Sequence, residues 1–146
     1  MHYEGKSTIN APREKVWKYI SDPHSTLEYV PMIQNLSVQS DDKFCMSVGA
    51  VVGWVKGEFN FDVQIVEKVP PSHTKLKAHG SGIKSVADVD IVVDLAENTS
   101  DKTDMTWTAD ARVGGLVAGV GQRLITQVVE KMIGELFDKL RNEMEK

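Results

Sequence analysis

Apolar residues recur at helical spacing through the last third of the chain. From about residue 116 to residue 140 they lie three or four positions apart, the pattern of one face of a long helix. Repeated steps of four exceed one helical turn, so this face turns gradually around the helix axis. A twisted antiparallel sheet has a surface that turns in the same way and could bury this apolar face. The apolar positions are Val117, Val120, Leu124, Val128, Met132, Leu136 and Leu140, joined by Ile125, Val129, Ile133 and Phe137.

The middle of the chain, residues 33–114, changes to a period of two. Apolar and polar residues alternate in residues 44–52, 57–65, 87–95 and 105–113, as they do in strands with one buried face. Polar or proline-rich turns separate these segments. We therefore predict six strands in this part of the chain.

The N-terminal segment adds one strand and two short helices to the prediction. Residues 2–10 alternate like a strand, and Pro12 stands where the first turn of a helix tolerates proline. This helix ends near Pro23, and a second short helix is expected at residues 24–29. The predicted fold is α+β, a helix-grip arrangement in one domain of residues 1–146. A curved seven-stranded antiparallel sheet wraps around the long C-terminal helix, with the two short helices after the first strand.

Composition narrows the class of protein and of partner. The chain has 146 residues, 41% of them hydrophobic, which is enough for one domain with a substantial core. A formal net charge of −4 and the lack of a Lys/Arg cluster speak against nucleic acid as a partner. The single Cys45 fits a reducing compartment, and neither a signal pattern nor eighteen consecutive apolar residues occur. We expect a soluble, cytoplasmic protein.

Short motifs spread over nearly the whole chain carry a family resemblance. They are Ala11-Pro12-Arg13-Glu14-Lys15-Val16-Trp17 with Asp22-Pro23, Val55-Lys56-Gly57-Glu58-Phe59, Pro70-Pro71, Gly80-Ser81-Gly82 and Val120-Gly121-Gln122-Arg123-Leu124-Ile125. With these motifs and the predicted order of elements, the chain resembles the START-like superfamily of helix-grip folds, also called Bet v 1-like or SRPBCC. Within that superfamily, the glycine motif and the last motif resemble the G-subunit family of carbon monoxide dehydrogenase.

The resemblance implies a binding protein rather than a catalytic subunit. Helix-grip proteins hold lipids, sterols, polyketides or other apolar molecules between the sheet and the long helix. Members of the G-subunit family are accessory factors of molybdenum-containing carbon monoxide dehydrogenases or their relatives, linked to membrane recruitment or quinone coupling. The implied partners are a lipid or quinone-like molecule and an enzyme of that type. Many members extend into a further tail whereas this chain stops at Lys146, so at most transient membrane contact is expected.

A hydrophobic cavity beneath the helix is the hypothesis that joins the pattern to the resemblance. Glycines at positions 114, 115, 119 and 121 would let a backbone or ligand approach closely at the start of the helix. A filled core without a cavity is the alternative, and Trp54 is expected at a strand turn. The sequence does not identify the hydrogen-bond donors that a quinone headgroup needs. The predicted lining is Phe44, Met46, Phe59, Phe61, Val63, Ile91, Trp107, Leu124, Val128 and Met132.

Catalytic and metal-binding patterns are weak throughout the sequence. His2, His24, His73 and His79 lack the spacing of zinc ligands, and Cys45 has no evident His partner. The acidic residues at 88, 90 and 94 share a strand face that we interpret as solvated. We predict no catalytic residue, metal or cofactor. Two alternatives stay open: a docking or membrane-recruitment subunit without a ligand, and a cyclase-like or hydrolase-like enzyme using the same cavity.

Overall fold

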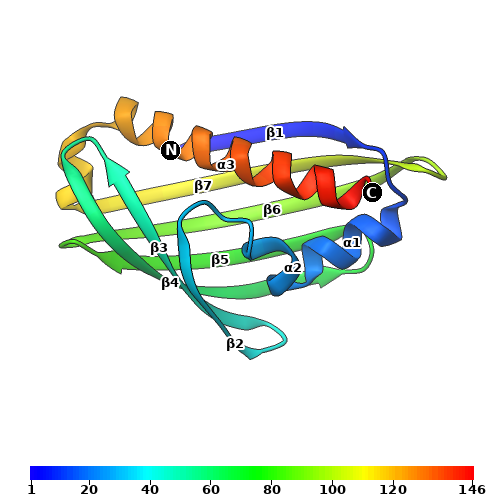
Figure 1. Ribbon diagram of the computed structural model, residues 1–146, viewed down its shortest axis with the longest axis horizontal. Coiled ribbons are helices and arrows are strands. Elements are labelled where there is room, and N and C mark those ends of the chain that lie inside the picture. The colour runs from blue at the N-terminus through cyan, green and yellow to red at the C-terminus, as the bar shows by residue number, and fades with distance from the viewer.

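A single antiparallel sheet curves around the C-terminal helix in the computed structural model (Figure 1). The structure describes the backbone of residues 1–146 and the side chains of all residues but 23 and 24. The seven strands lie in the order β1-β7-β6-β5-β4-β3-β2, so β1 and β2 form the two edges. They are β1 (His2–Ile9), β2 (Ile33–Ser40), β3 (Lys43–Val52), β4 (Val55–Val69), β5 (His73–Gly82), β6 (Ser85–Thr99) and β7 (Lys102–Gly115).

Burial alternates along the strands as predicted. In β4, Phe59 and Val63 are buried while Glu58 and Asp62 are exposed. Residues paired across neighbouring strands point to the same face of a sheet, so the register extends this alternation from strand to strand. One such row on the concave face is Phe44, Val63, Ala78, Val89 and Ala111. The seven-stranded antiparallel sheet and its C-terminal helix are therefore confirmed.

Two short helices follow β1, and their bounds differ from the prediction. Helix α1 (Arg13–Ser21) ends where expected, but α2 (Pro23–Leu27) begins one residue earlier and ends two residues before position 29. Val16 on α1 is completely buried. The remaining residues before β2 form turns, and Met32 there has a positive φ of 62°. This part of the chain therefore matches the predicted pattern only approximately.

The long helix begins later than the apolar spacing predicts. A 3₁₀ turn, η1 (Leu116–Val120), precedes α3 (Gln122–Met144). Gly115 and Gly121 flank η1 with φ values of 80° and 104°, a backbone region closed to an α-helix. The two glycines therefore keep residues 116–120 out of α3, although the apolar spacing predicts one continuous helix. At its other end α3 runs four residues beyond Leu140, and Leu140 and Met144 are buried there.

The buried residues form three clusters, two of which are linked through the half-buried Phe61. One lies where α1 and the end of α3 meet the sheet and contains Ile9, Val16 and Leu140. A second lies at the start of α3 around Phe59 and Ile125, and a third forms under β2 to β5. A small domain usually has one contiguous core. The middle of the concave face lies between these clusters.

Candidate functional site

The centre of the concave face carries small, half-buried apolar side chains. Ala78, Ala87, Val89, Ile91 and Ala111 point inward from β5, β6 and β7, yet each is only half-buried. Inward positions on the central strands of a covered sheet are normally the most buried ones. The backbone of α3 comes closer to β3, α1 and η1 than to the central strands. These central side chains therefore keep part of their surface accessible to solvent.

A pocket of about 480 Å³ opens along one side of α3, against the edge strand β1. Its volume is within the range of small-molecule sites. The ring of Trp107 is stacked on that of Phe137, with centroids 5.5 Å apart and planes at 22°. The pocket is also lined by Tyr3, Ser7 and Ile133. Charged side chains of α3 line it as well, at Glu130, Asp138 and Arg141.

Two glycines give this pocket its width. A Cβ atom on Gly5 would lie 2.5 Å from Nε1 of Trp107, closer than any real contact, so only glycine lets the indole lie against β1. Gly5 and Trp107 are directly paired across β1 and β7. On the helix side, a Cβ on Gly134 would meet no atom within 4 Å. The space beside Gly134 is therefore open.

Two hydrogen-bonding groups beside the aromatic pair have weak partners or none. The hydroxyl of Tyr3, a 7% exposed residue, lies 3.4 Å from Oγ1 of Thr126, which is long for an O–H···O bond, and 3.4 Å from Sδ of Met1, a weak acceptor. Among the described residues, none accepts a hydrogen bond from the indole N–H of Trp107. A donor or acceptor brought by a guest could therefore be matched here without breaking a strong existing bond.

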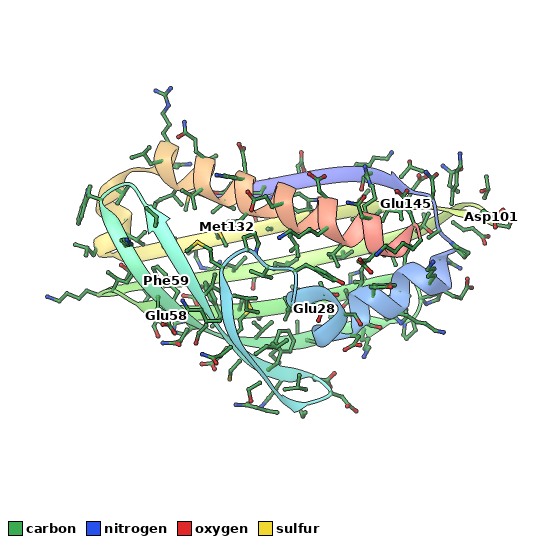
Figure 2. All side chains as sticks on the ribbon, viewed as in Figure 1. Glu28, Glu58, Phe59, Asp101, Met132 and Glu145 are labelled. Atoms are coloured by element: carbon green, nitrogen blue, oxygen red, sulfur yellow. The ribbon has the colours of Figure 1, made fainter. Side chains whose placement is uncertain are left out.

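The ten residues predicted to line a cavity fall into different environments. Phe44, Phe59 and Val63 are buried in the second and third clusters. Leu124 is 42% exposed and lies beside the β3–β4 turn, because a Cβ on Gly53 would be 3.4 Å from it. Met132 belongs to none of the three clusters and lies midway along α3 (Figure 2). The half-buried members are Met46, Phe61, Ile91, Trp107, Val128 and Met132.

Of the predicted lining, only Trp107 belongs to the pocket beside β1. The predicted lining does not include four other residues of this pocket, Gly5, Ile133, Gly134 and Phe137. Ile133 and Phe137 belong to the apolar face that rotates around α3, so their helical phase was the available signal. The pairing of Gly5 with Trp107 joins residues far apart in the chain, so it could not be predicted from a local sequence pattern.

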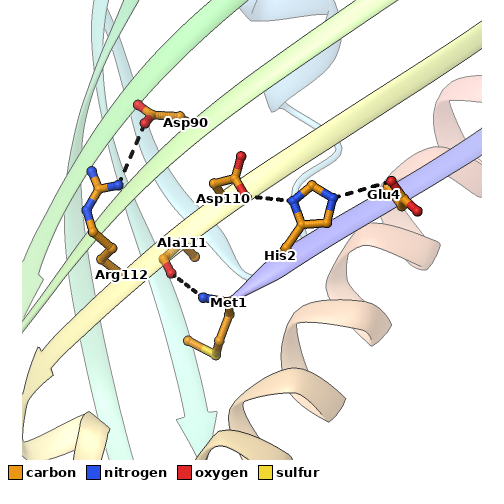
Figure 3. Close-up of polar contacts among 7 residues, drawn as sticks. All are labelled: Met1, His2, Glu4, Asp90, Asp110, Ala111 and Arg112. Carbon is orange, nitrogen blue, oxygen red and sulfur yellow. Dashed lines mark hydrogen bonds and ion pairs between the residues drawn. The ribbon is translucent and has the colours of Figure 1, made fainter.

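Histidines on the convex face pair with carboxylates of neighbouring strands. Nδ1 of His2 lies 2.6 Å from Oδ1 of Asp110, and its Nε2 lies 3.3 Å from Oε2 of Glu4 (Figure 3). The hydrogen bond to Asp110, followed by that to Glu4, raises the pKa of His2. His79 likewise lies 2.7 Å from Asp88. His2 and His79 thus each pair with a carboxylate on a neighbouring strand.

His73 bridges two carboxylates on the same face. Its ring nitrogens lie 2.8 Å from Glu67 and 2.7 Å from Asp94. The bond to Glu67 raises the pKa of His73 and lowers that of Glu67. Asp90 pairs with Arg112 at 3.8 Å (Figure 3). Within the described residues, no group of three His, Cys, Asp or Glu side chains could hold a metal ion, and the side chain of residue 24 lies outside them.

A second groove of about 480 Å³ crosses the convex face but is lined mainly by polar and charged side chains. Cys45 lies there, and its thiol donates to Oδ1 of Asp62 at 2.9 Å. This bond, with a smaller effect from burial, raises the pKa of the Cys45 thiol. A raised pKa leaves little thiolate, the form that attacks.

A curved antiparallel sheet that holds a long helix over a half-open apolar face defines the START-like class of helix-grip proteins. The sequence matches the family of the carbon monoxide dehydrogenase G subunit (CoxG) over residues 5–145. The chain belongs to that family, as the sequence motifs predicted. Comparison with curated proteins gave no match.

Solved structures resemble the whole chain. A conserved protein from Geobacillus kaustophilus is 27% identical, with a TM-score of 0.90 over 99% of this chain and 95% of its own. A START superfamily protein from Mycobacterium smegmatis is 11% identical, with a TM-score of 0.76 over 99% and 97%. The Zhui aromatase/cyclase from Streptomyces is 12% identical, with a TM-score of 0.74 over 99% and 93%. The latter two show a shared fold.

Proposed function

We propose that residues 1–146 form one START-like domain that binds an apolar, ring-bearing molecule, a quinone or a lipid, beneath α3. In this proposal the protein serves a carbon monoxide dehydrogenase-type enzyme in the cytoplasm as a non-catalytic accessory factor. The observation that carries the proposal is the half-buried apolar centre of the concave face, which the three core clusters leave between them. Family membership supports the accessory role and the choice of enzyme partner.

The guest would lie with its tail along the concave face and its ring near the pocket beside β1. The predicted lining supplies the apolar contacts for the tail, and of these residues Met132 lies midway along α3 and outside the three clusters. Flexible Met and flat aromatic side chains adapt to guests of irregular shape. For a quinone ring, we assign the indole N–H of Trp107 and the hydroxyls of Tyr3 and Thr126 as the hydrogen-bonding groups. These are donors that the sequence alone did not identify.

Native mass spectrometry with organic extraction tests this proposal most directly. The protein is purified without detergent from a host that makes quinones and lipids. We expect a stoichiometric apolar adduct. An empty protein that also takes up neither added quinones nor fatty acids would contradict the proposal and favour a docking subunit without a ligand. Turnover of a bound polyketide or ester would instead favour the cyclase-like or hydrolase-like alternative.

A pair of leucine substitutions on α3 tests the position of the guest. Gly134→Leu adds a side chain into the open space beside β1, whereas Lys131→Leu adds the same side chain at an exposed position of the same helix. We expect Gly134→Leu to weaken quenching of Trp107 fluorescence by a short-chain quinone at least tenfold, and Lys131→Leu to leave it unchanged. A Trp54→Phe background removes the most exposed indole. Equal quenching in the two variants would exclude this pocket as the position of the ring.

A further inference from the structure

Strand β2 forms an edge of the sheet that carries no charge. In the part of the chain that the structure describes, β3 is its single neighbouring strand, so its outer side is unpaired. The eight residues Ile33–Ser40 have the sequence IQNLSVQS, without a charged residue, a proline or a glycine. Proteins usually protect an edge strand with charges or proline, because its free N–H and C=O groups can pair with another chain. The sequence of β2 provides neither.

The other edge of the sheet differs in charge and in cover. Strand β1 carries His2, Glu4 and Lys6. Helix α3 lies beside β1, with the pocket between them, whereas β2 lies at the opposite side of the sheet (Figure 1). Leu27 of α2 and Leu36 of β2 both pack against the third cluster, so α2 meets β2 on its concave side. The edge of β2 is therefore the less protected of the two.

The middle of β2 pairs regularly with β3. Irregularities lie near both ends of the strand, between Ile33 and Asn35 and between Val38 and Ser40. The four residues 35–38 pair one to one with β3. Irregularities of this kind bend a strand and limit further pairing. A second strand would therefore pair chiefly with the middle of β2, which makes the available joint short.

Apolar and polar residues alternate along this middle part. Leu36 and Val38 lie on the concave side, where Val38 pairs with the buried Phe44. Val38 is nevertheless 40% exposed, because no strand lies beyond it. Ser37 lies on the convex side and pairs with Cys45. A strand added at this edge would cover Val38 only if it brought an apolar residue to the concave side.

We propose that β2 pairs antiparallel with β2 of a second copy of the chain, about a two-fold axis at Ser37. In this register Leu36 of each copy lies opposite Val38 of the other copy on the concave side. Asn35 lies opposite Gln39 on the convex side, and the two Ser37 residues face each other. Directly opposed residues share a face of the sheet, so apolar residues meet apolar ones and amides meet amides. The edge is thus complementary to itself, as a two-fold interface requires.

Charge is compatible with this arrangement. The acidic turn that follows β2, Asp41 and Asp42, lies outside the joint in each copy. Antiparallel pairing about Ser37 places the two acidic turns at opposite ends of the joint, so like charges are not opposed. An unrelated strand would have to match the same apolar and amide pattern independently. A joint of this length buries less than the roughly 1,200 Å² of a standard interface, so we expect a weak dimer with a Kd of roughly 10–100 µM.

The joint needs neither a guest nor a membrane. It uses the edge of the sheet opposite β1, so the pocket beside β1 stays accessible in both copies. Of the helices that the structure describes, none is long and apolar enough to cross a bilayer. Dimerisation through β2 and binding of an apolar molecule beneath α3 can therefore be tested separately.

Sedimentation velocity at protein concentrations from about 5 to 500 µM tests the proposal. We expect the unchanged chain to pass from monomer to dimer over this range. The variant Asn35→Lys/Ser37→Lys/Gln39→Lys places three pairs of lysines opposite each other and should weaken dimerisation on the order of 100-fold. The control Gln64→Lys/Ser81→Lys/Thr106→Lys adds the same charge at exposed convex positions of β4, β5 and β7 and should dimerise like the unchanged chain.

A charge-swapped mixture tests the register itself. Asn35→Glu/Ser37→Glu/Gln39→Glu should also stay monomeric alone, whereas mixing it in equal amounts with the lysine variant opposes Lys to Glu at all three pairs. We expect this mixture to dimerise within about fivefold of the unchanged chain. Hydrogen exchange of the unchanged chain needs no variant: the amides of residues 33–40 should slow as concentration rises, because pairing protects them.

Four results would overturn the proposal. They are a chain that stays monomeric at every concentration, equal weakening by the control, a mixture no better than either variant alone, and exchange in β2 that ignores concentration. Protection of β2 by an added dehydrogenase subunit in a chain that stays monomeric would assign this edge to a foreign strand. Dimerisation that survives in the lysine variant but is lost in Trp54→Ala would assign the contact to the β3–β4 turn and would likewise overturn the proposal.

Discussion

Trp107 lies with its indole against the backbone of β1 because the residue opposite it has no side chain. Gly5→Ala would place a methyl group 2.5 Å from Nε1 of the rigid indole, so the ring must move and its stack on Phe137 must change. We expect the free energy of unfolding to fall by about 1–3 kcal/mol, as for other overpacked sites. Near-ultraviolet circular dichroism and urea unfolding measure the two effects.

Gly134→Ala is the matched control for this substitution. A Cβ there meets no atom within 4 Å, and the position is inside α3. Replacing a helical glycine with alanine should stabilise the protein by about 0.5–1 kcal/mol. If Gly5→Ala proved as stable as the unchanged protein, the indole would have room that the structure does not give it.

The sequence was sufficient to place Trp107 on the concave face but not to name its neighbours. Strand alternation fixed the side of the sheet to which the indole points, since that depends only on a period of two. Its contact with Gly5 depends on which strands pair and in what register, and Phe137 depends on the phase of a helix relative to the sheet. Those relations are set by long-range packing, which a single sequence does not display.

The start of α3 is an example of backbone conformation overriding a side-chain pattern. Apolar spacing predicts one helix from residue 116, but the positive φ of Gly121 separates η1 from α3. This difference also explains why Leu124 is exposed. It lies in the first turn of α3 beside the β3–β4 turn instead of in the middle of a longer helix. A glycine cluster is therefore a better guide to this helix boundary than hydrophobic periodicity.

Gly115→Ala should destabilise the connection between β7 and η1. Gly115 has a φ of 80°, and a Cβ there would lie 2.3 Å from the carbonyl oxygen of Lys84. Because the obstacle is backbone, it cannot rotate away as a side chain would. We expect a loss of about 2–3 kcal/mol in urea unfolding. Gly119→Ala, in the same turn but with open space around it, should have a far smaller effect; similar losses for both would contradict the assigned turn.

The bridge that His73 forms between β4 and β6 should make stability depend on pH. Hydrogen bonds to Glu67 and Asp94 raise the pKa of His73, so its stabilising contribution is complete below the ordinary pKa of histidine and is lost as pH rises through the folded value. Glu67 has a lowered pKa, so its contribution is lost as pH falls through its own folded value. The bridge should therefore stabilise most between about pH 5 and 6.5.

Urea midpoints measured from pH 5 to pH 8.5 check this expectation in His73→Gln against the unchanged protein. The difference between the two proteins should be largest at the acidic end of this range and shrink toward pH 8.5. Added salt should reduce it, because both carboxylates are more than half exposed. A difference that is constant with pH would show that His73 contributes by packing and not by charge.

At the scale of the whole molecule, a guest would supply contacts that the three clusters leave unmade. A ligand that binds only the folded state stabilises it by about 2.7 kcal/mol when its free concentration is a hundred times Kd. For a chain of this size we expect the unfolding midpoint to rise by about 5–10 °C with a bound quinone or lipid. Differential scanning fluorimetry measures this shift. A tenfold weaker Kd in Gly134→Leu should lower the stabilisation to about 1.4 kcal/mol and so reduce the shift to about half. An unchanged midpoint in the original protein would argue for a filled core.

The three clusters also bear on which guests fit. Ile125 fixes one end of α3 in one cluster, and Leu140 fixes the other end in another, while Met132 between them is held by neither. The two fixed residues are about 22 Å apart along the helix axis. Residues 128 and 129 also pack against the cluster of Ile125, and residues 136 and 137 against that of Leu140, so only the turn around Met132 is free of both. That turn can shift outward without losing either attachment. We therefore expect the length of a guest to be limited by these two attachments, and its width to be tolerated over a broad range.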